Sequence, residues 1–198
     1  MKAFRKALSI LLCILTVFSC TAFAFAAEAP AAEATGFTDE DFLVVKGRTL
    51  YNKKGEHIQL KGVNLGAWLV REDWLCPDHI PEGTQYDGEY IYDTLEERFG
   101  REKAKELMDM YYENWITEWD LDNIKEKGFN CVRVPFWYRN FYYDDKGTKI
   151  LDENGEWDFS ILDWVVEECR ERELYVILDM HGAVGSQSDA PHSGRAFQ

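Results

Sequence analysis

The segment Tyr175–Arg195 constrains the fold of this chain more than any other stretch. It opens with Tyr175–Leu178, a short apolar run of β-forming residues that predicts a buried strand. Ionisable side chains follow at once, at Asp179 and His181, and a loop rich in glycine, serine and proline comes next. A buried strand that ends in polar groups and opens into a loop is typical of the active face of a (β/α) barrel.

A second segment, Cys131–Phe136, has the same design, because Arg133 lies inside an apolar run that Pro135 interrupts. Burying an arginine is costly unless it has a partner, so we expect an acceptor close to Arg133. Two buried strands that both carry ionisable groups predict neighbouring members of one parallel sheet.

The two segments also agree in phase. Side chains alternate between the two faces of a strand. Arg133 therefore lies on one face of the first strand, and Asp179 and His181 lie together on one face of the second. If both faces point into a barrel, Arg133 meets Asp179 and His181 near its mouth. A purely structural ion pair between Arg133 and Asp179 is the alternative interpretation. If the strands do belong to a barrel, their opposite faces should point toward covering helices. Those faces carry Val132, Val134, Val176, Leu178 and Met180.

Turn signals and hydrophobic periodicity give the order of the remaining elements. A hairpin is predicted for residues 42–51 and a strand for residues 57–65. Gly62 within this strand and Gly66 just after it allow close approach of the backbone. Thr117 with Asp120 forms a capping box for one helix, and Ser160 is the expected cap of another. Helices are expected over residues 90–99, 101–115, 117–127 and 160–171. The order strand–helix–strand–helix–strand predicts an α/β fold built of parallel units.

The N-terminus predicts export. A basic start is followed by an apolar stretch over residues 7–25 and by small residues, which is the pattern of a secretory signal peptide cleaved after Ala26 or Ala27. An uncleaved anchor helix and lipid anchoring at Cys20 are the alternatives. The next residues are rich in alanine, glutamate and proline and predict a flexible linker. We therefore divide the chain into a signal peptide (1–26), a linker (27–41) and a folded domain (42–198), and expect a secreted protein.

The net charge indicates the class of partner, and the cysteine content bears on disulfides and metal sites. The formal charge is −14, and loss of three basic residues with the signal gives −14 − 3 = −17. Such a surface repels nucleic acid and anionic membranes, so a neutral partner is favoured. Neither CxxC nor HExxH is present to suggest a zinc site. Three cysteines remain after cleavage, Cys76, Cys131 and Cys169, and we expect the last two to be thiols of the core.

Aromatic residues make up 15% of the chain, and several follow the predicted strands closely. Flat apolar rings suit the C–H faces of sugars, although packing within loops is an equal alternative for any one ring. The rings in question are Trp68, Trp74, Trp137, Tyr138, Phe141, Tyr142 and Tyr143.

Five segments, taken in order, carry a family resemblance. They are LKGVNLGAWLV (60–70), REDW (71–74), WITE (115–118), GFNCVRVP (128–135) and DMHGAVGSQ (179–187). With these segments the chain resembles glycoside hydrolase family 5, the (β/α)8 TIM-barrel group of cellulases and related β-glycanases, and most of all its exo-β-1,3-glucanase branch. The resemblance covers residues 42–198.

This resemblance implies retaining hydrolysis by two glutamates, one acid/base and one nucleophile, at the ends of the fourth and seventh barrel strands. The first lies within an Asn-Glu pair in this family, and the present sequence contains no such pair. We therefore expect an N-terminal fragment with about three β/α units and an N-terminal hairpin, lacking both catalytic glutamates and inactive alone.

The resemblance also implies roles for residues that are present. Arg133 matches the arginine that supports the nucleophile, His181 matches a histidine that lines the −1 sugar subsite, and Glu72 matches a loop glutamate that binds sugar hydroxyls. Glu72 could instead be a surface charge or pair with Arg71. Trp68 and His192 are further candidates for substrate binding, with packing and solvation as their alternatives.

The expected partner is a β-glucan, with neither cofactor nor metal, and the complete enzyme is expected to be a monomer. The sequence leaves open an endo-β-1,4-glucanase of the same family and a non-catalytic sugar-binding module. It does not separate β-1,3 from β-1,4 linkages or endo from exo action.

Overall fold

The computed structural model describes residues 36–72, 74–75 and 87–195. The predicted signal peptide, the linker up to residue 35, and Cys76 lie outside the described residues. In the described part of the chain, no helix has both the length and the apolar character that crossing a bilayer requires.

The predicted hairpin is confirmed. It consists of β1 (Leu43–Lys46) and β2 (Thr49–Asn52), and β3 (His57–Ile58) adds a third antiparallel strand in the order β1-β2-β3. The predicted strand over residues 57–65 is wrong in one respect, because it is two strands in two sheets. The second, β4 (Gly62–Asn64), belongs to the parallel sheet.

The side chain of Asn130 explains this break. Its amide nitrogen donates to the carbonyl of Gln59 at 3.0 Å, and its oxygen accepts from the backbone of Lys61 at 2.7 Å. Both groups are thereby withdrawn from a continuous ladder. The chain then passes close to the next strand, since a Cβ on Gly62 would lie 2.2 Å from the carbonyl oxygen of Cys131.

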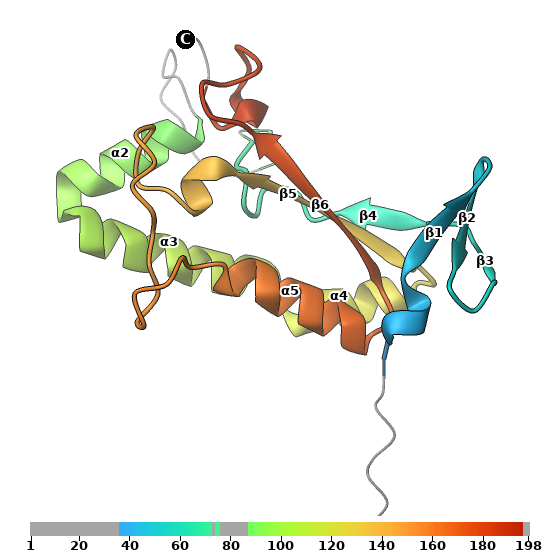
Figure 1. The fold of residues 1–198 in the computed structure, drawn as a ribbon. Helices are drawn as coiled ribbons and strands as arrows, with labels where there is room; N and C mark the ends of the chain where they lie inside the picture. Colours follow the sequence, from blue (N-terminus) through green and yellow to red (C-terminus); the bar gives the residue numbers. More distant parts are fainter. Residues whose placement is uncertain (1–35, 73, 76–86, 196–198) are drawn as a thin grey trace, which may run out of the picture. The chain divides into compact units, whose positions relative to one another are not determined.

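The second sheet is parallel, in the order β4-β5-β6, with β5 (Cys131–Trp137) between β4 and β6 (Tyr175–Gly182) (Figure 1). Among the described residues, the crossover from β4 to β5 holds three helices, and a single helix connects β5 to β6. The helices are α2 (Gly88–Phe99), α3 (Arg101–Trp115), α4 (Glu118–Glu126) and α5 (Ser160–Glu171). Three short 3-10 turns complete the list: η1 (Asp39–Asp41), η2 (Tyr138–Asn140) and η3 (Pro191–Ser193). The predicted parallel α/β order is confirmed.

The helix boundaries follow local chemistry. Thr117 and Asp120 form the expected capping box at the start of α4. Gly100, with φ 80°, separates α2 from α3, a backbone conformation in which glycine has little steric cost. Ser160 is not the cap of α5 but its first residue. Its amide and hydroxyl both donate to Asp158, at 3.1 and 2.6 Å, so the carboxylate satisfies the donors at this end.

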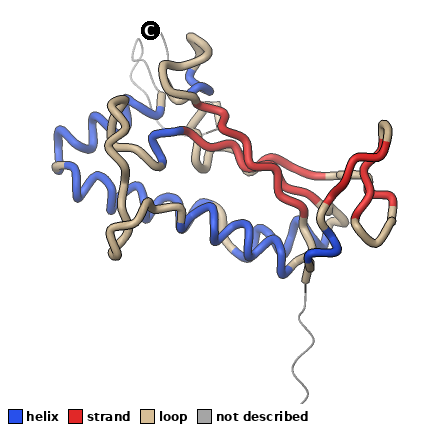
Figure 2. The backbone as a smooth tube through the Cα atoms, viewed as in Figure 1, coloured by secondary structure: helices blue, strands red, loops and turns tan. Residues whose placement is uncertain are grey.

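The core lies between the parallel sheet and the helices along one of its faces (Figure 2). Val132 and Val134 are fully buried there, as predicted for the outward face of β5. Cys131 and Cys169 are buried free thiols, as expected, and burial raises the pKa of the Cys169 thiol to about 12.

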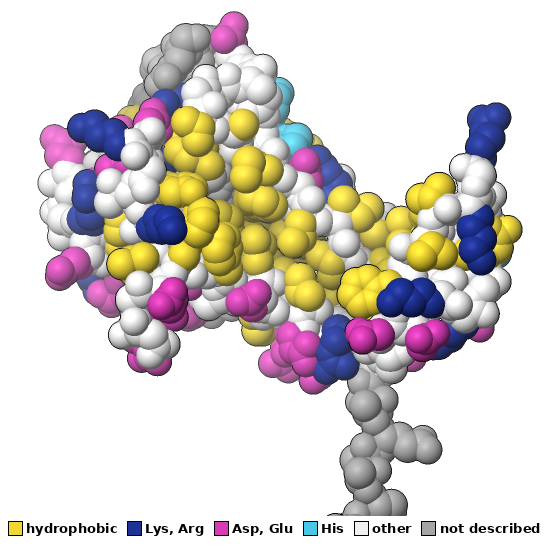
Figure 3. Space-filling view, viewed as in Figure 1, with side chains coloured by type: hydrophobic (Ala, Val, Ile, Leu, Met, Phe, Trp, Pro, Cys, Tyr) yellow, Lys and Arg dark blue, Asp and Glu magenta, His cyan; other side chains and the backbone are white. Residues whose placement is uncertain are grey.

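The outward face of β6 differs from the prediction, because Leu178 and Met180 are 48% and 58% exposed. Ile177, on the opposite face, is 44% exposed. Figure 3 shows a broad hydrophobic area beside β6. The described residues place no helix over this end of β6 and no strand beyond it.

The predicted linker 27–41 is too long at its C-terminal end. Phe37 packs on Tyr175, with 4.4 Å between ring centroids, and its amide donates to the carbonyl of Arg170 at 2.9 Å. Asp41 is buried and pairs with Lys54 at 2.5 Å. Residues 36–41 therefore belong to the folded domain, because their polar groups are satisfied by it.

Candidate active site

The three parallel strands bring three polar side chains together around Arg133. Asn64 is the register partner of Arg133 on β4, and its side-chain oxygen accepts from the guanidinium at 3.3 Å. Asp179 on β6 accepts from Nη2 of the same guanidinium. Nδ1 of His181 lies 3.2 Å from that Nη2 and 2.9 Å from the Asp179 carboxylate. The predicted meeting of Arg133, Asp179 and His181 is confirmed.

The cluster is open to solvent on one side. The side chains of Arg133, Asp179 and His181 are 34%, 30% and 30% exposed, so each keeps a surface that a ligand could touch. The Arg133–Asp179 ion pair is present, as the structural interpretation required. A partly exposed guanidinium with five donors can hold this partner and still offer N–H groups to a second carboxylate.

The loop after β6 brings a second imidazole to the cluster. His192 lies in η3, and its ring centroid is 5.7 Å from that of His181. Next to it, the Ser193 hydroxyl is fully buried and lies within 3.0 Å of the carbonyl oxygens of Ser188, Ala190 and Arg195. This packing fixes the turn that carries His192.

An ion cluster holds the end of the same loop. Arg195 is buried and donates to both carboxylate oxygens of Glu89 at the start of α2, and to Asp145 at 2.7 Å. The guanidinium of Arg195, with help from the Tyr138 hydroxyl, holds the pKa of Asp145 below its usual range. Burial raises the pKa of Tyr138 to about 12. The loop is thus tied both to α2 and to the loop after β5.

Trp137 forms the apolar base beneath this loop. It is buried at the end of β5, and Gly182 and Gly194 pack directly on its ring. A Cβ would lie 2.3 Å from the ring at Gly182 and 2.5 Å from it at Gly194. Absence of side chains at these glycines lets the loop fold down onto the strand end.

The loop after β4 places one carboxylate beside an exposed indole. Nε1 of Trp74 donates to Glu72 at 2.8 Å, and the Trp74 side chain is 75% exposed. The guanidinium of Arg71 lies over the ring of Tyr111, 4.6 Å from its centroid. Glu72 and Trp74 therefore form a pair in which an acceptor and an apolar face lie next to each other.

Comparison with known proteins identifies the family. The family model described as cellulase (glycosyl hydrolase family 5) matches residues 96–196, about half of the chain. The chain belongs to glycosyl hydrolase family 5.

Two curated relatives of this family 5 chain carry names of glycoside-cleaving enzymes. A β-xylosidase of Phanerodontia chrysosporium is 34% identical over 77% of this chain and 30% of its own length. A glucan 1,3-β-glucosidase 2 of Wickerhamomyces anomalus is 31% identical over 75% of this chain and 35% of its own. The chain thus spans about a third of the length of these relatives.

A solved structure supports the fold. The rutinosidase from Aspergillus niger superposes with a TM-score of 0.50 at 20% identity, over 68% of this chain and 36% of that one. Together with the family, this likeness assigns the parallel sheet and its helices to part of a (β/α)8 barrel, as predicted.

Trp68 is a correction to the predicted site. The family 5 chain buries this ring completely, and its Nε1 donates to the carbonyl of Tyr112 at 2.8 Å. A ring with no exposed surface cannot stack on a sugar. Ala67, with φ 56°, turns the backbone just before Trp68, and this change of direction is not visible in strand periodicity.

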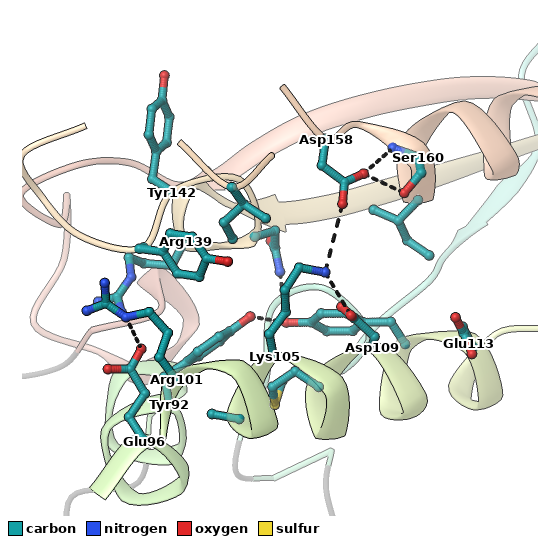
Figure 4. A pocket seen from close by; sticks show the side chains of 17 residues that line it. Tyr92, Glu96, Arg101, Lys105, Asp109, Glu113, Arg139, Tyr142, Asp158 and Ser160 are labelled. Atoms are coloured by element: carbon teal, nitrogen blue, oxygen red, sulfur yellow. Dashed lines mark hydrogen bonds and ion pairs between the residues drawn. The ribbon is translucent and has the colours of Figure 1, made fainter. Parts of the chain in front are cut away.

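A cavity of about 160 Å³ lies elsewhere, between α2, α3 and the loop that precedes α5 (Figure 4). No residue of β4, β5 or β6 lines it. Its charged groups largely satisfy one another: Lys105 pairs with Asp109 at 2.7 Å and with Asp158 at 3.8 Å, and Arg101 pairs with Glu96 at 3.4 Å. We interpret it as an ionic contact between the helices and that loop.

Sequence reasoning missed the ion cluster of Glu89, Asp145 and Arg195. Arg195 lies 106 positions from Glu89 and 50 positions from Asp145, and no motif links the three residues. The one available signal was Arg195 itself, a basic residue in a loop rich in glycine, serine and alanine.

Proposed function

We propose that the whole protein is a secreted retaining glycoside hydrolase acting on β-glucan, of the exo-β-1,3-glucanase kind. This chain would supply the first three strands of the barrel and the side chains that support catalysis. The acid/base and nucleophile glutamates would come from the remaining strands of the whole protein. The observation that carries the proposal is the partly exposed Arg133 among Asn64, Asp179 and His181 at the carboxyl edge of the sheet.

In this proposal Arg133 holds the nucleophile. A guanidinium favours the ionised form of a neighbouring carboxylate, and its planar fork fixes the direction of the carboxylate oxygens. Asn64 and Asp179 hold the guanidinium from two sides. Asp179 thus has a positioning role, acting through Arg133.

His181 would bind the sugar through its imidazole ring. Its Nδ1 lies 2.9 Å from the Asp179 carboxylate, and a carboxylate accepts but cannot donate. If Nδ1 carries the proton and donates to Asp179, Nε2 is left as an acceptor for a sugar hydroxyl. His192, with its ring 5.7 Å from that of His181, would contact the same sugar or its neighbour.

The exo preference rests on Glu72 and Trp74. A carboxylate can accept protons from two adjacent hydroxyls of a terminal sugar, while an exposed indole can pack on the face of that sugar. Their direct contact at 2.8 Å orients both groups. The names of the glucan 1,3-β-glucosidase relatives support laminarin-type linkages as the substrate class.

Glu72→Ala in the whole protein tests this assignment. We expect weaker binding of laminarin, by ~1.5–3 kcal/mol, because hydrogen bonds to a charged group are lost. The measurement is a time course of product sizes from laminarin and from carboxymethylcellulose. Early release of glucose from laminarin, reduced in the variant, is the expected outcome.

Trp74→Phe is the companion variant, because it keeps an aromatic ring but removes the N–H that orients Glu72, together with part of the ring. We expect a smaller loss than with Glu72→Ala. A rapid fall in carboxymethylcellulose viscosity, equal in wild type and Glu72→Ala, would contradict the exo assignment and favour an endo-β-1,4-glucanase. Secretion is tested in the same cultures, where the protein in the medium should begin at Ala27 or Glu28.

A further inference from the structure

An exposed tryptophan on α4 has no evident role in the fold. Trp119 is 71% exposed, whereas Leu121, two positions later on the same helix, is fully buried in the core. A large aromatic side chain contributes most to stability when it is buried, so an indole left on the surface needs another explanation.

Trp119 lines a groove of about 740 Å³ between the end of α3, the start of α4 and α5. The half-buried Trp164 lines the same groove, and its ring packs edge-on against the core residue Trp68, with 6.0 Å between centroids. Trp164 is therefore held rigidly, while Trp119 projects. The remaining lining residues are Tyr112, Glu113, Ile116, Thr117, Glu118, Asp122, Ser160 and Ile161.

The polar groups of the groove suit hydroxyls. Within the described residues, the carboxylates of Glu113 and Glu118 make no hydrogen bond or ion pair, so they remain available as acceptors. In the same part of the chain, the indole nitrogens of Trp119 and Trp164 have no acceptor, so they remain available as donors. A sugar presents hydroxyls that donate and accept, and C–H faces that pack on rings.

The charge of the groove excludes anions. Three carboxylates line it, and no Lys, Arg or His does. Asp122 alone among the three is neutralised, by Arg172 at 2.6 Å. An anionic polysaccharide or a phosphate would be repelled, whereas a neutral sugar is not.

We propose that this groove is a second binding site for neutral β-glucan, outside the site at the carboxyl edge of the sheet. It rests on the proposed function only for the identity of the polymer. A chain long enough to occupy both sites would be held near the catalytic end, which raises its effective concentration there.

The test is native electrophoresis in gels that contain laminarin, with the whole protein in a His181→Ala background so that binding at the catalytic end does not mask the groove. We expect the Trp119→Ala variant to need about tenfold more laminarin in the gel for the same retardation. Trp119→Phe should keep most of the retardation, since stacking needs a ring. Phe99→Ala, which removes an exposed ring of α2 outside the groove lining, is the matched control and should migrate as the parent.

Equal retardation of the parent and Trp119→Ala would overturn the proposal. Stronger retardation by chitosan than by laminarin, lost in Trp119→Ala, would also overturn it and indicate a cationic ligand. With His181 restored, Trp119→Ala should lower turnover of laminarin more than turnover of an aryl β-glucoside. Absence of any β-glucan hydrolysis would defeat the proposed function. The electrophoresis result would still decide whether the groove binds β-glucan.

Discussion

Arg133→Lys in the whole protein should lower kcat on laminarin at least ~10²-fold, the scale expected when a charged, preorganised donor is lost. Lysine keeps the charge but replaces the planar fork with a point charge on a flexible stem. In the structure the guanidinium donates to Asn64 and to Asp179 at once, which a single ammonium cannot reproduce with the same direction. The nucleophile would then lose orientation rather than substrate affinity, so KM should change much less than kcat.

A matched variant separates catalysis from folding. Arg172 makes ion pairs with Asp122 and Glu168 on the helices and does not contact the cluster around Arg133. Arg172→Lys should leave kcat close to that of the wild type, and both variants should unfold at similar denaturant concentrations. If Arg133→Lys keeps more than about half of the wild-type activity, Arg133 is only a structural ion-pair partner of Asp179 and the assignment fails.

Residues 27–198 expressed by themselves should show no hydrolysis of laminarin or of an aryl β-glucoside, and should aggregate or stay partly unfolded. Retaining hydrolysis needs two carboxylates at opposite ends of the scissile bond, and the proposal places both glutamates outside this chain. The physical reason for aggregation is β6, where Ile177, Leu178 and Met180 are between 44% and 58% exposed. Its ladder is paired on one side only within the described residues, and such an edge pairs readily with other chains.

Sedimentation velocity and an activity assay on the purified segment check this result, with the whole protein as control. A monodisperse monomer with a cooperative unfolding transition would show that the exposed strand is tolerated. Measurable turnover would place a catalytic carboxylate pair within residues 27–198 and defeat the assignment of both glutamates to the remaining strands.

The sequence by itself determined the local elements and the phase of the two strands that carry the cluster. Alternation along Cys131–Phe136 and Tyr175–Leu178 was sufficient to place Arg133 on the same face of the sheet as Asp179 and His181, because the register pairs Arg133 with Ile177 and side chains alternate with a two-residue period. The helix boundaries near Gly100 and Thr117 followed from backbone conformation and capping, which are properties of a few adjacent residues.

Only the tertiary structure decided the surroundings of that cluster. The break between β3 and β4 depends on Asn130, a residue about 70 positions away, whose side chain takes up the backbone groups at the break. The burial of Trp68 depends on α3, whose Tyr112 carbonyl accepts its N–H. The turn that carries His192 is held by Glu89 and Asp145 through Arg195. Each of these is a contact between distant segments, and the energy that fixes it comes from burial and pairing that exist only after the chain has folded, so no local pattern records them.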